Sequence, residues 1–136
     1  MSASVRAALP WLPPAGTVWQ VEAGEHWDAV RVERRTGLVA IDRLDGQCGA
    51  VICDPWTRIL YFLTVPGATA DWSVESTRAC STSTYVSVPS LGAEGHTLHW
   101  ECRPTRDLHL TDPGLLRLAL EDAVAHTHRP RTEPTP

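Results

Sequence analysis

The segment from Gly49 to Val65 constrains the fold most, because it holds two apolar runs separated by a turn sequence. The runs GAVIC and RILYFLTV are rich in β-branched and aromatic residues, and Asp54-Pro55-Trp56-Thr57 lies between them. Proline directly after aspartate favours a type I turn. The pattern predicts a β-hairpin, and we expect its second strand to be central in a sheet because it is apolar on both faces.

Alternating apolar and polar residues predict further strands on both sides of this hairpin. Upstream, the pattern indicates strands over residues 17–21 and 27–32. Downstream, it indicates strands over 85–88 and 97–102, which we expect to form a second hairpin around the loop LGAEG. Residues 67–82 mix Ala, Thr and Ser and are predicted to form a loop.

Two helices are predicted beside the strands. In residues 36–44, apolar side chains recur at the spacing of a helix face, and Thr36 is the expected N-cap. A strand through 38–41 is the alternative for this stretch. Asp112 and Pro113 begin the last helix as N-cap and first helical residue, and an apolar stripe of period 3.6 follows them.

The order of these elements predicts one α+β domain. The chain has 136 residues, which is an ordinary length for a single domain. We expect an antiparallel sheet of about four to six strands with two flanking helices, spanning residues 17–126. A Pro- and Ala-rich irregular lead-in is expected over 1–16, and a Pro-rich disordered tail over 127–136.

Composition narrows the classes of function. The formal net charge is −4, so a nucleic-acid role needs a local basic patch. All 12 basic residues are arginine, which excludes Schiff-base lysine chemistry and a P-loop of the GK[ST] type. No apolar run reaches the roughly 18 residues of a membrane span, so no membrane partner is expected. Pro10, Pro13 and Pro14 interrupt the N-terminal apolar stretch, so we predict no signal peptide and expect a cytoplasmic protein.

The cysteines are expected to be reduced thiols that behave as small buried hydrophobic residues. Their spacing matches no zinc ribbon or finger. They are Cys48, Cys53, Cys80 and Cys102.

One histidine-rich segment has the spacing of a helical metal site, His96-x-x-His99-x-x-Cys102. The segment alternates like a strand instead, with Trp100 and Cys102 expected on one side and His99 and Glu101 on the other. His96 and His99 then lie on opposite faces. We therefore predict no metal site there.

Three motif-like segments occur in this order along the chain: TGLVAIDRLDG, DPWTRILYFLTVPG and TYVSVPSLGAEGHTLHWE. Their characteristic positions are Gly37, Leu38, Val39, Asp42, Tyr61, Phe62, Val65, Pro66, Gly67, Tyr85, Pro89, Ser90, Gly95 and Trp100. In order and spacing this set resembles the bifunctional DNA primase/polymerase (prim-pol) domain. The closing LTDPGLLRLAL is similar to short actinobacterial proteins that look like trimmed relatives of that family.

The resemblance implies a prim-pol core and two-metal nucleotidyl transfer, in which carboxylates hold two cations. The family's Asp-x-Asp places both side chains on one face of a strand, whereas Asp42 and Asp45 have spacing three. The family's histidine falls near Ile59, and Trp56 and Thr57 replace a glycine pair that would let the backbone approach a triphosphate. We therefore expect a trimmed, catalytically degenerate domain that does not polymerise nucleotides.

Asp42 and Asp45 are the only candidates for catalysis or metal binding that we derive from the sequence. If they are functional, they would hold Mg²⁺ or Mn²⁺, and the chain would be a small metal-dependent enzyme. The alternative is two solvated acidic residues at a helix end. In that case no catalytic residue, metal or cofactor is expected.

Arginines form the candidate nucleic-acid surface. Arg31, Arg34 and Arg35 lie in VRVERR, where guanidinium groups would contact phosphates; a solvated face is the alternative. Arg58 places a charged side chain on an otherwise apolar strand, so it must either pair with a carboxylate or lie at a sheet edge. Asp54 of the same hairpin is the candidate partner.

Two function hypotheses follow. The first is a degenerate prim-pol-like domain with weak nucleic-acid or nucleotide binding, in which Arg31, Arg34, Arg35 and Arg58 would share one sheet face. The alternative is a non-enzymatic protein-interaction or regulatory module on the same fold, marked by exposed tryptophan. Trp56 would be a stacking platform for a base in the first hypothesis. In the second, Trp56 or Trp72 would contact a protein partner. If the Trp56 side chain folds back on the sheet, it would support neither hypothesis.

Overall fold

The structure is a computed structural model that describes residues 2–128, with side chains from Val5 onward. Its elements in chain order are α1 (Ser2–Ala8), β1 (Val18–Glu22), β2 (Asp28–Glu33), α2 (Arg34–Leu44), β3 (Val51–Asp54), β4 (Ile59–Thr64), β5 (Thr77–Cys80), β6 (Tyr85–Pro89), β7 (His99–Cys102) and α3 (Pro113–Thr127).

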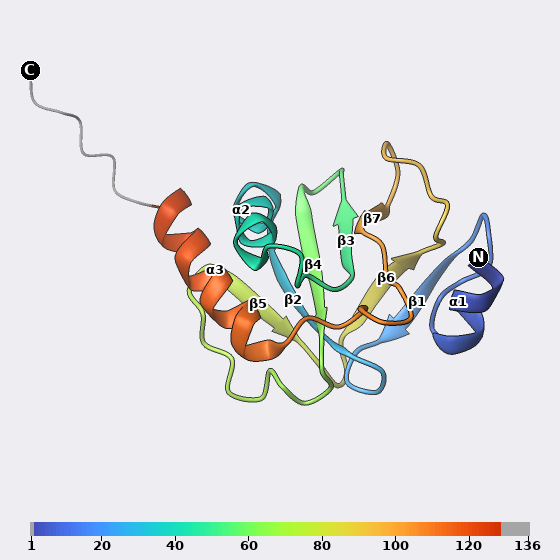
Figure 1. Ribbon diagram of the computed structural model, residues 1–136, viewed down its shortest axis with the longest axis horizontal. Helices are drawn as coiled ribbons and strands as arrows, with labels where there is room; N and C mark the ends of the chain where they lie inside the picture. Colours follow the sequence, from blue (N-terminus) through green and yellow to red (C-terminus); the bar gives the residue numbers. More distant parts are fainter. Residues whose placement is uncertain (1, 129–136) are drawn as a thin grey trace, which may run out of the picture.

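These elements form three layers (Figure 1). The middle layer is a five-stranded antiparallel sheet in the order β5-β2-β4-β3-β7. The helices α2 and α3 cover one face, and a two-stranded antiparallel sheet, β1-β6, covers the other together with the chain that follows α1. The predicted α+β class, with an antiparallel sheet and flanking helices, is confirmed.

The predicted hairpin is the centre of the large sheet. The strands β3 and β4 pair antiparallel, and the Asp54 carboxylate accepts hydrogen bonds from the amides of Trp56 and Thr57 at 3.0 and 3.3 Å. Because β4 lies between β2 and β3, it is buried on both sides. Phe62 packs with the helices, whereas Leu63 packs beneath β1-β6. The prediction of a central strand is therefore confirmed.

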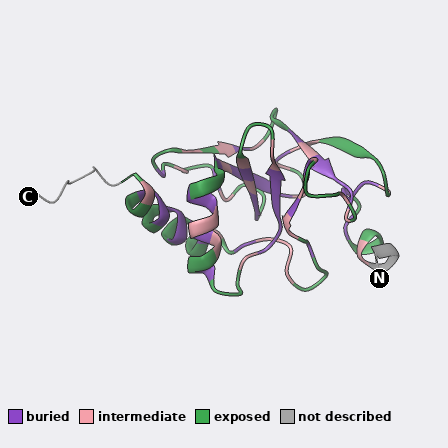
Figure 2. Cartoon of the chain, turned by 90° about the horizontal axis from the view of Figure 1, so that it is seen from above, coloured by how far each residue is buried: buried purple, intermediate pink, exposed green. Residues whose placement is uncertain are grey.

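The helix layer depends on a close approach of α2 to the sheet. A Cβ on Gly37 would lie 2.6 Å from Leu60 Cδ1, so glycine lets the helix settle on β4. Glu33, and not the predicted Thr36, is the N-cap of α2. Thr36 is buried, and its hydroxyl lies 2.8 Å from that of Thr127 in α3. Figure 2 shows buried residues on the strands and on the inward sides of these helices.

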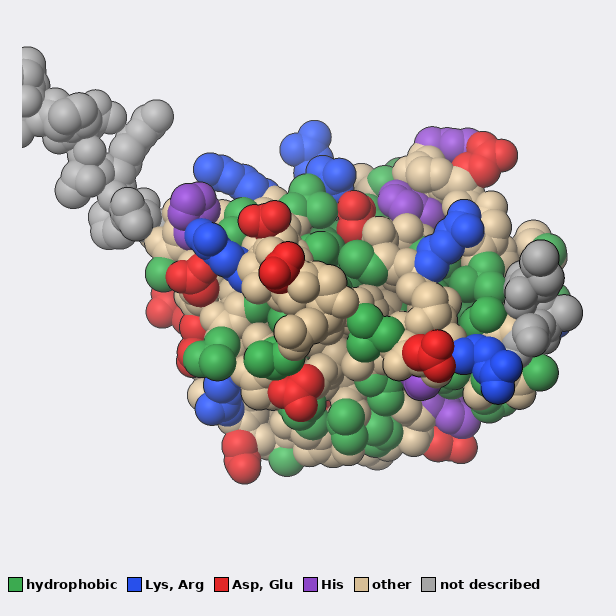
Figure 3. Space-filling model, in the orientation of Figure 1, with side chains coloured by type: hydrophobic (Ala, Val, Ile, Leu, Met, Phe, Trp, Pro, Cys, Tyr) green, Lys and Arg blue, Asp and Glu red, His purple; other side chains and the backbone are tan. Residues whose placement is uncertain are grey.

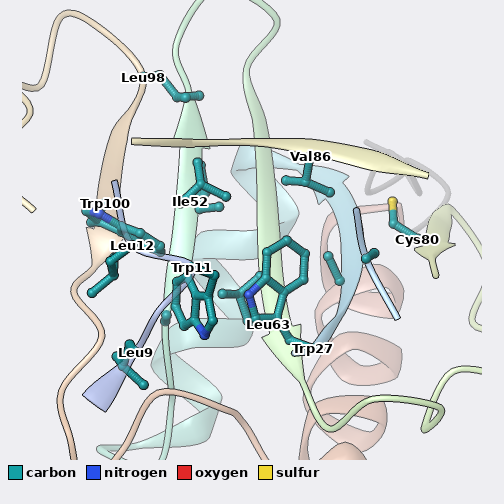
Figure 4. Packing of buried hydrophobic residues seen from close by; sticks show 14 residues of the cluster. Leu9, Trp11, Leu12, Trp27, Ile52, Leu63, Cys80, Val86, Leu98 and Trp100 are labelled. Carbon is teal, nitrogen blue, oxygen red and sulfur yellow. The ribbon is translucent and has the colours of Figure 1, made fainter. Parts of the chain in front are cut away.

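The opposite face of the sheet carries a core built around tryptophans (Figure 4). Trp11 meets Trp27 edge-on, with 5.9 Å between ring centroids, and its ring centroid lies 6.1 Å from that of Trp100. All three indoles are buried. Large aromatic rings contribute much of the apolar area that a small domain can bury, so Trp11 ties the N-terminal segment to the sheet.

The N-terminal segment differs from the irregular lead-in predicted over 1–16. Residues 2–8 form α1, a stretch whose Ala content favours helix. Its prolines begin only at Pro10, after the helix has ended. Leu9 and Leu12 are buried beside Trp11, so this segment is part of the core.

Two predictions for the second half of the chain are wrong. Residues 67–82 were predicted as a loop, yet they contain β5, an edge strand where polar side chains reach solvent. The strands β6 and β7 do not form a hairpin, because β6 pairs with β1 and β7 with β3. Both errors concern pairings between segments far apart in sequence, which periodicity does not encode.

A buried carboxylate holds the connection between β4 and β5 onto the sheet. Asp28, at the start of β2, is fully buried. Its carboxylate accepts hydrogen bonds from the amide and hydroxyl of Thr69 at 3.2 and 2.6 Å, and from the hydroxyl of Ser81 at 3.1 Å. Buried charged groups are tolerated when they are hydrogen-bonded in this way.

The last helix begins as predicted. Pro113 is its first residue, and the Asp112 carboxylate accepts a hydrogen bond from the Leu115 amide at 3.0 Å. Of the tail predicted over 127–136, residues 127 and 128 belong to α3 and its C-cap, and the others lie outside the described residues. None of the described helices is long and apolar enough to cross a bilayer.

Candidate functional site

A cleft of about 960 Å³, here called the arginine cleft, opens where α2 begins. Its walls come from the first turn of α2, the β3–β4 turn and the loop before β7. These segments meet at the upper edge of the sheet in Figure 1, and Figure 3 shows arginine side chains (blue) along that edge. The charged and metal-ligating residues of its lining are Glu33, Arg34, Arg35, Arg58, Cys53 and His99.

Backbone geometry brings the arginines together. Arg58 ends the β3–β4 turn in the left-handed region, at φ 60°, and its carbonyl oxygen accepts a hydrogen bond from the Arg34 amide at 2.8 Å. Arg34 and Arg35 form the first turn of α2, whose N-cap Glu33 makes no side-chain capping bond within the described chain. The amides of this turn add partial positive charge to the cleft.

The arginines of the cleft have no carboxylate partner within residues 2–128. The only arginine ion pair there joins Arg43 to Asp122 at 2.6 Å. The predicted pairing of Arg58 with Asp54 is not formed, because Asp54 accepts hydrogen bonds from the turn amides instead. Exposed guanidinium groups of this kind can bind phosphate or carboxylate through paired N–H donors.

One part of the cleft brings a thiol, an imidazole and a carboxylate together. Cys53 on β3 lies opposite His99 on β7, and Glu101 follows two residues later. One donor atom from each residue lies within 4.8 Å of the other two. Burial raises the pKa of the Cys53 thiol, and the charge of Glu101 raises it further, whereas the Arg34 guanidinium opposes both effects. Without a cation, the thiol is therefore protonated at neutral pH.

This cluster depends on strand pairing and was missed from the sequence. The alternation that places His99 and Glu101 on one side was predicted, but their neighbour Cys53 lies far away along the chain. A register shift between β3 and β7 also leaves Glu101 without a partner. As a result Cys102 packs on the helix side and Trp100 in the tryptophan core, which corrects the prediction that both point the same way.

The other charged candidates lie away from the cleft. Arg31 is on the side of β2 that carries Ala29 and the tryptophan core, so the four arginines do not share one face. Asp42 and Asp45 are exposed at the C-terminal end of α2, about 10 and 15 Å along the helix from Arg35 at the usual helical rise. In the described chain, only the Cys53 cluster groups three metal-ligating side chains.

Trp56 lines a second hollow, a groove of about 430 Å³ with a mainly apolar wall. Its side chain is 70% exposed, so it does not fold back on the sheet. The groove continues past Val18 and Leu98. Pro55 and Thr57 line the arginine cleft, whereas Trp56 between them lines the second hollow, so the β3–β4 turn contributes to both.

The other cysteines include a close pair. A hydrogen bond between the thiols of Cys48 and Cys102 raises the pKa of Cys48 and lowers that of Cys102. Burial raises the pKa of Cys80. All the cysteines are free thiols. Cys53 and Cys80 are buried as predicted, whereas Cys48 and Cys102 are only half-buried, unlike the prediction.

Comparisons with known proteins find no matching family model, no matching curated protein and no matching solved structure. The function of the arginine cleft is therefore inferred from its own residues and geometry.

Proposed function

We propose that the chain is a catalytically degenerate, prim-pol-like domain that binds single-stranded nucleic acid through the arginine cleft. The convergence of Arg34, Arg35 and Arg58 on one cleft, without carboxylate partners in the described chain, carries this proposal. Two of these residues belong to the basic cluster singled out in the sequence, and the third comes from the hairpin. Arg31 of that cluster is not part of the proposed surface.

The β3–β4 turn favours a single strand over a duplex. Guanidinium groups bind phosphates regardless of sequence, and an exposed indole stacks on any unpaired base. Trp56 provides such an exposed indole two residues before Arg58 on the same turn, whereas the bases of a duplex are stacked on one another. With a net charge of −4, the chain as a whole does not attract nucleic acid, so binding depends on local positive charge. We expect a dissociation constant of about 10⁻⁵ M at moderate salt, typical of non-specific binding.

The position of the aspartates supports binding without polymerisation. Two-metal transfer needs carboxylates that hold cations about 3.5–4 Å apart beside the reacting phosphates. Asp42 and Asp45 lie at the opposite end of α2 from the arginine cleft, on a helix where the resembling segment of the family is a strand. We therefore expect no primer synthesis with Mg²⁺ or Mn²⁺ and nucleotides.

Fluorescence anisotropy of a labelled oligothymidylate tests the proposal, with duplex DNA as a second ligand. Arg58→Ala should weaken binding at least about tenfold, the loss expected for one charge-assisted hydrogen bond of about 1.5 kcal/mol. Arg106→Ala, which removes the same charge from an exposed site outside the cleft, should change affinity less than twofold. Equal effects of the two variants would contradict the proposal, as would no binding at about 100 μM protein, ten times the expected dissociation constant.

A second candidate, a protein-interaction module, is favoured by the groove beside Trp56 and by exposed Val18 and Tyr85 on the β1-β6 sheet. Trp72, the other predicted contact, is half-buried and donates its Nε1–H to the Thr77 hydroxyl at 2.8 Å, so it contributes less. Affinity capture separates the two functions. A protein partner lost with Trp56→Ala but kept with Arg58→Ala would support the module, and loss of nucleic acid with Arg58→Ala would support the arginine cleft.

A further inference from the structure

We propose that Cys53, His99 and Glu101 form a binding site for a divalent transition-metal ion of the zinc type. Sulfur, nitrogen and oxygen donors together suit Zn²⁺, whereas Mg²⁺ and Mn²⁺ prefer oxygen donors alone. One donor atom of each residue lies within 4.8 Å of the other two. This site differs in residues and chemistry from the carboxylate pair Asp42 and Asp45 that the sequence suggested.

Strand geometry holds the three donors on a rigid frame. Cys53 and His99 are directly opposite each other in neighbouring strands, and Glu101 is the next residue of β7 with the same orientation as His99. In a tetrahedral zinc site, bond lengths place the ligand atoms about 3.4–3.6 Å apart. The donors therefore need to close by at most about 1.4 Å, which small side-chain rotations provide.

The ring of His99 is already oriented for such a role. Its Nδ1 atom lies 2.7 Å from the carbonyl oxygen of Thr97. A carbonyl oxygen only accepts, so Nδ1 carries the proton and Nε2 keeps a lone pair. Metal-binding histidines commonly have their second nitrogen fixed by a carbonyl or carboxylate in this way.

Charge balance also favours a divalent cation. Binding requires the Cys53 thiol to release one proton to solvent, after which thiolate and the Glu101 carboxylate together neutralise the ion. Glu101 disfavours a thiolate when no cation is present, and a cation between the two groups reverses that repulsion.

Three protein ligands leave a fourth coordination position. Cys53 and His99 both line the arginine cleft, so this position is reached from the cleft and would take a water molecule. The ion can enter by the same route, although Cys53 itself is 1% exposed. The metal site does not depend on nucleic-acid binding, because both ligand strands belong to the folded sheet.

Titration of the reduced, metal-free protein with Co²⁺, without nucleic acid, tests the site. We expect one Co²⁺ per chain, the visible absorption of a tetrahedral ion and a thiolate-to-Co²⁺ charge-transfer band, all displaced by Zn²⁺. Cys53→Ser should abolish the charge-transfer band, and Glu101→Gln should weaken Zn²⁺ binding at least about tenfold. Cys80→Ser, a buried thiol on β5, is the matched control and should keep the spectrum.

Several results with these variants would overturn the metal site. Cys53 is buried, so His99→Ala at a half-exposed position provides a second test if Cys53→Ser does not fold. No charge-transfer band at stoichiometric Co²⁺ would overturn the site, as would a band that survives His99→Ala. A band lost in Cys48→Ser would assign the metal to the other thiol pair and overturn it too. Arg58→Ala should keep the Co²⁺ spectrum, so failure of nucleic-acid binding and failure of metal binding are separate results.

Discussion

Replacing Gly49 with alanine tests how the segment before α3 is held against the sheet. The Gly49 amide donates a hydrogen bond to the Thr111 hydroxyl at 2.8 Å, and the Ala50 amide donates to the His109 carbonyl at 3.1 Å. A Cβ on Gly49 would lie 2.7–2.8 Å from backbone atoms of His109 and Leu110. These neighbours are backbone, so they cannot yield by rotating a side chain.

The expected cost follows from these contacts. Overpacking of a buried site costs about 1–3 kcal/mol, and weakening the two hydrogen bonds adds about 1 kcal/mol. Alanine recovers about 0.4–1 kcal/mol by restricting the unfolded chain. The net loss in the free energy of unfolding for Gly49→Ala is therefore about 1–3.5 kcal/mol. For a domain of this length that lowers the melting temperature by roughly 10 °C.

Urea unfolding followed by far-UV circular dichroism measures this loss. Gly92→Ala is the matched control, because a Cβ there meets no atom within 4 Å. We expect that control to stay within about 0.5 kcal/mol of the wild type. A Gly49→Ala protein that is equally stable would refute the close packing of this segment.

Other predictions concern buried polar groups and side-chain chemistry. Asp28→Asn should lower the free energy of unfolding by about 2–3 kcal/mol, since an amide nitrogen cannot accept the bonds made to a buried carboxylate; a smaller loss by urea unfolding than for an exposed Asp71→Asn control would contradict this. Trp56→Ala should weaken oligothymidylate binding about fivefold or more without changing its salt dependence; a changed salt slope would argue against stacking. Alkylation followed by mass spectrometry should label Cys102 at lower pH than Cys80, because the Cys48 hydrogen bond lowers the pKa of Cys102 and burial raises that of Cys80. The reverse order would contradict the thiol pair.

Local patterns predicted the elements that depend on local forces. The β3–β4 hairpin follows from the Asp54 turn and two apolar runs, and the start of α3 follows from Asp112 and Pro113. The start of α2 was misplaced because the hydroxyl of Thr36 serves a contact with another helix. That contact joins residues 91 positions apart in the chain, and only the packed structure specifies it.

The candidate site was predictable only in part, for the same reason. Arg34 and Arg35 were recognisable as a basic cluster, and Arg58 as an unusual charge on an apolar hairpin. Their meeting depends on β2 delivering α2 beside the β3–β4 turn. Cys53 and His99 meet only because β3 pairs with β7, a pairing that the sequence analysis did not predict.

The salt dependence of oligothymidylate binding tests the central claim most directly. Each phosphate contact to a single strand contributes about −0.7 to the slope of log K against log salt. Contacts from Arg34, Arg35 and Arg58 therefore predict a slope of about −2 for the wild type and about −1.4 for Arg58→Ala. The Arg106→Ala control should keep the wild-type slope. Binding with a slope near zero, or a slope that Arg58→Ala leaves unchanged, would contradict a phosphate-binding role for the arginine cleft.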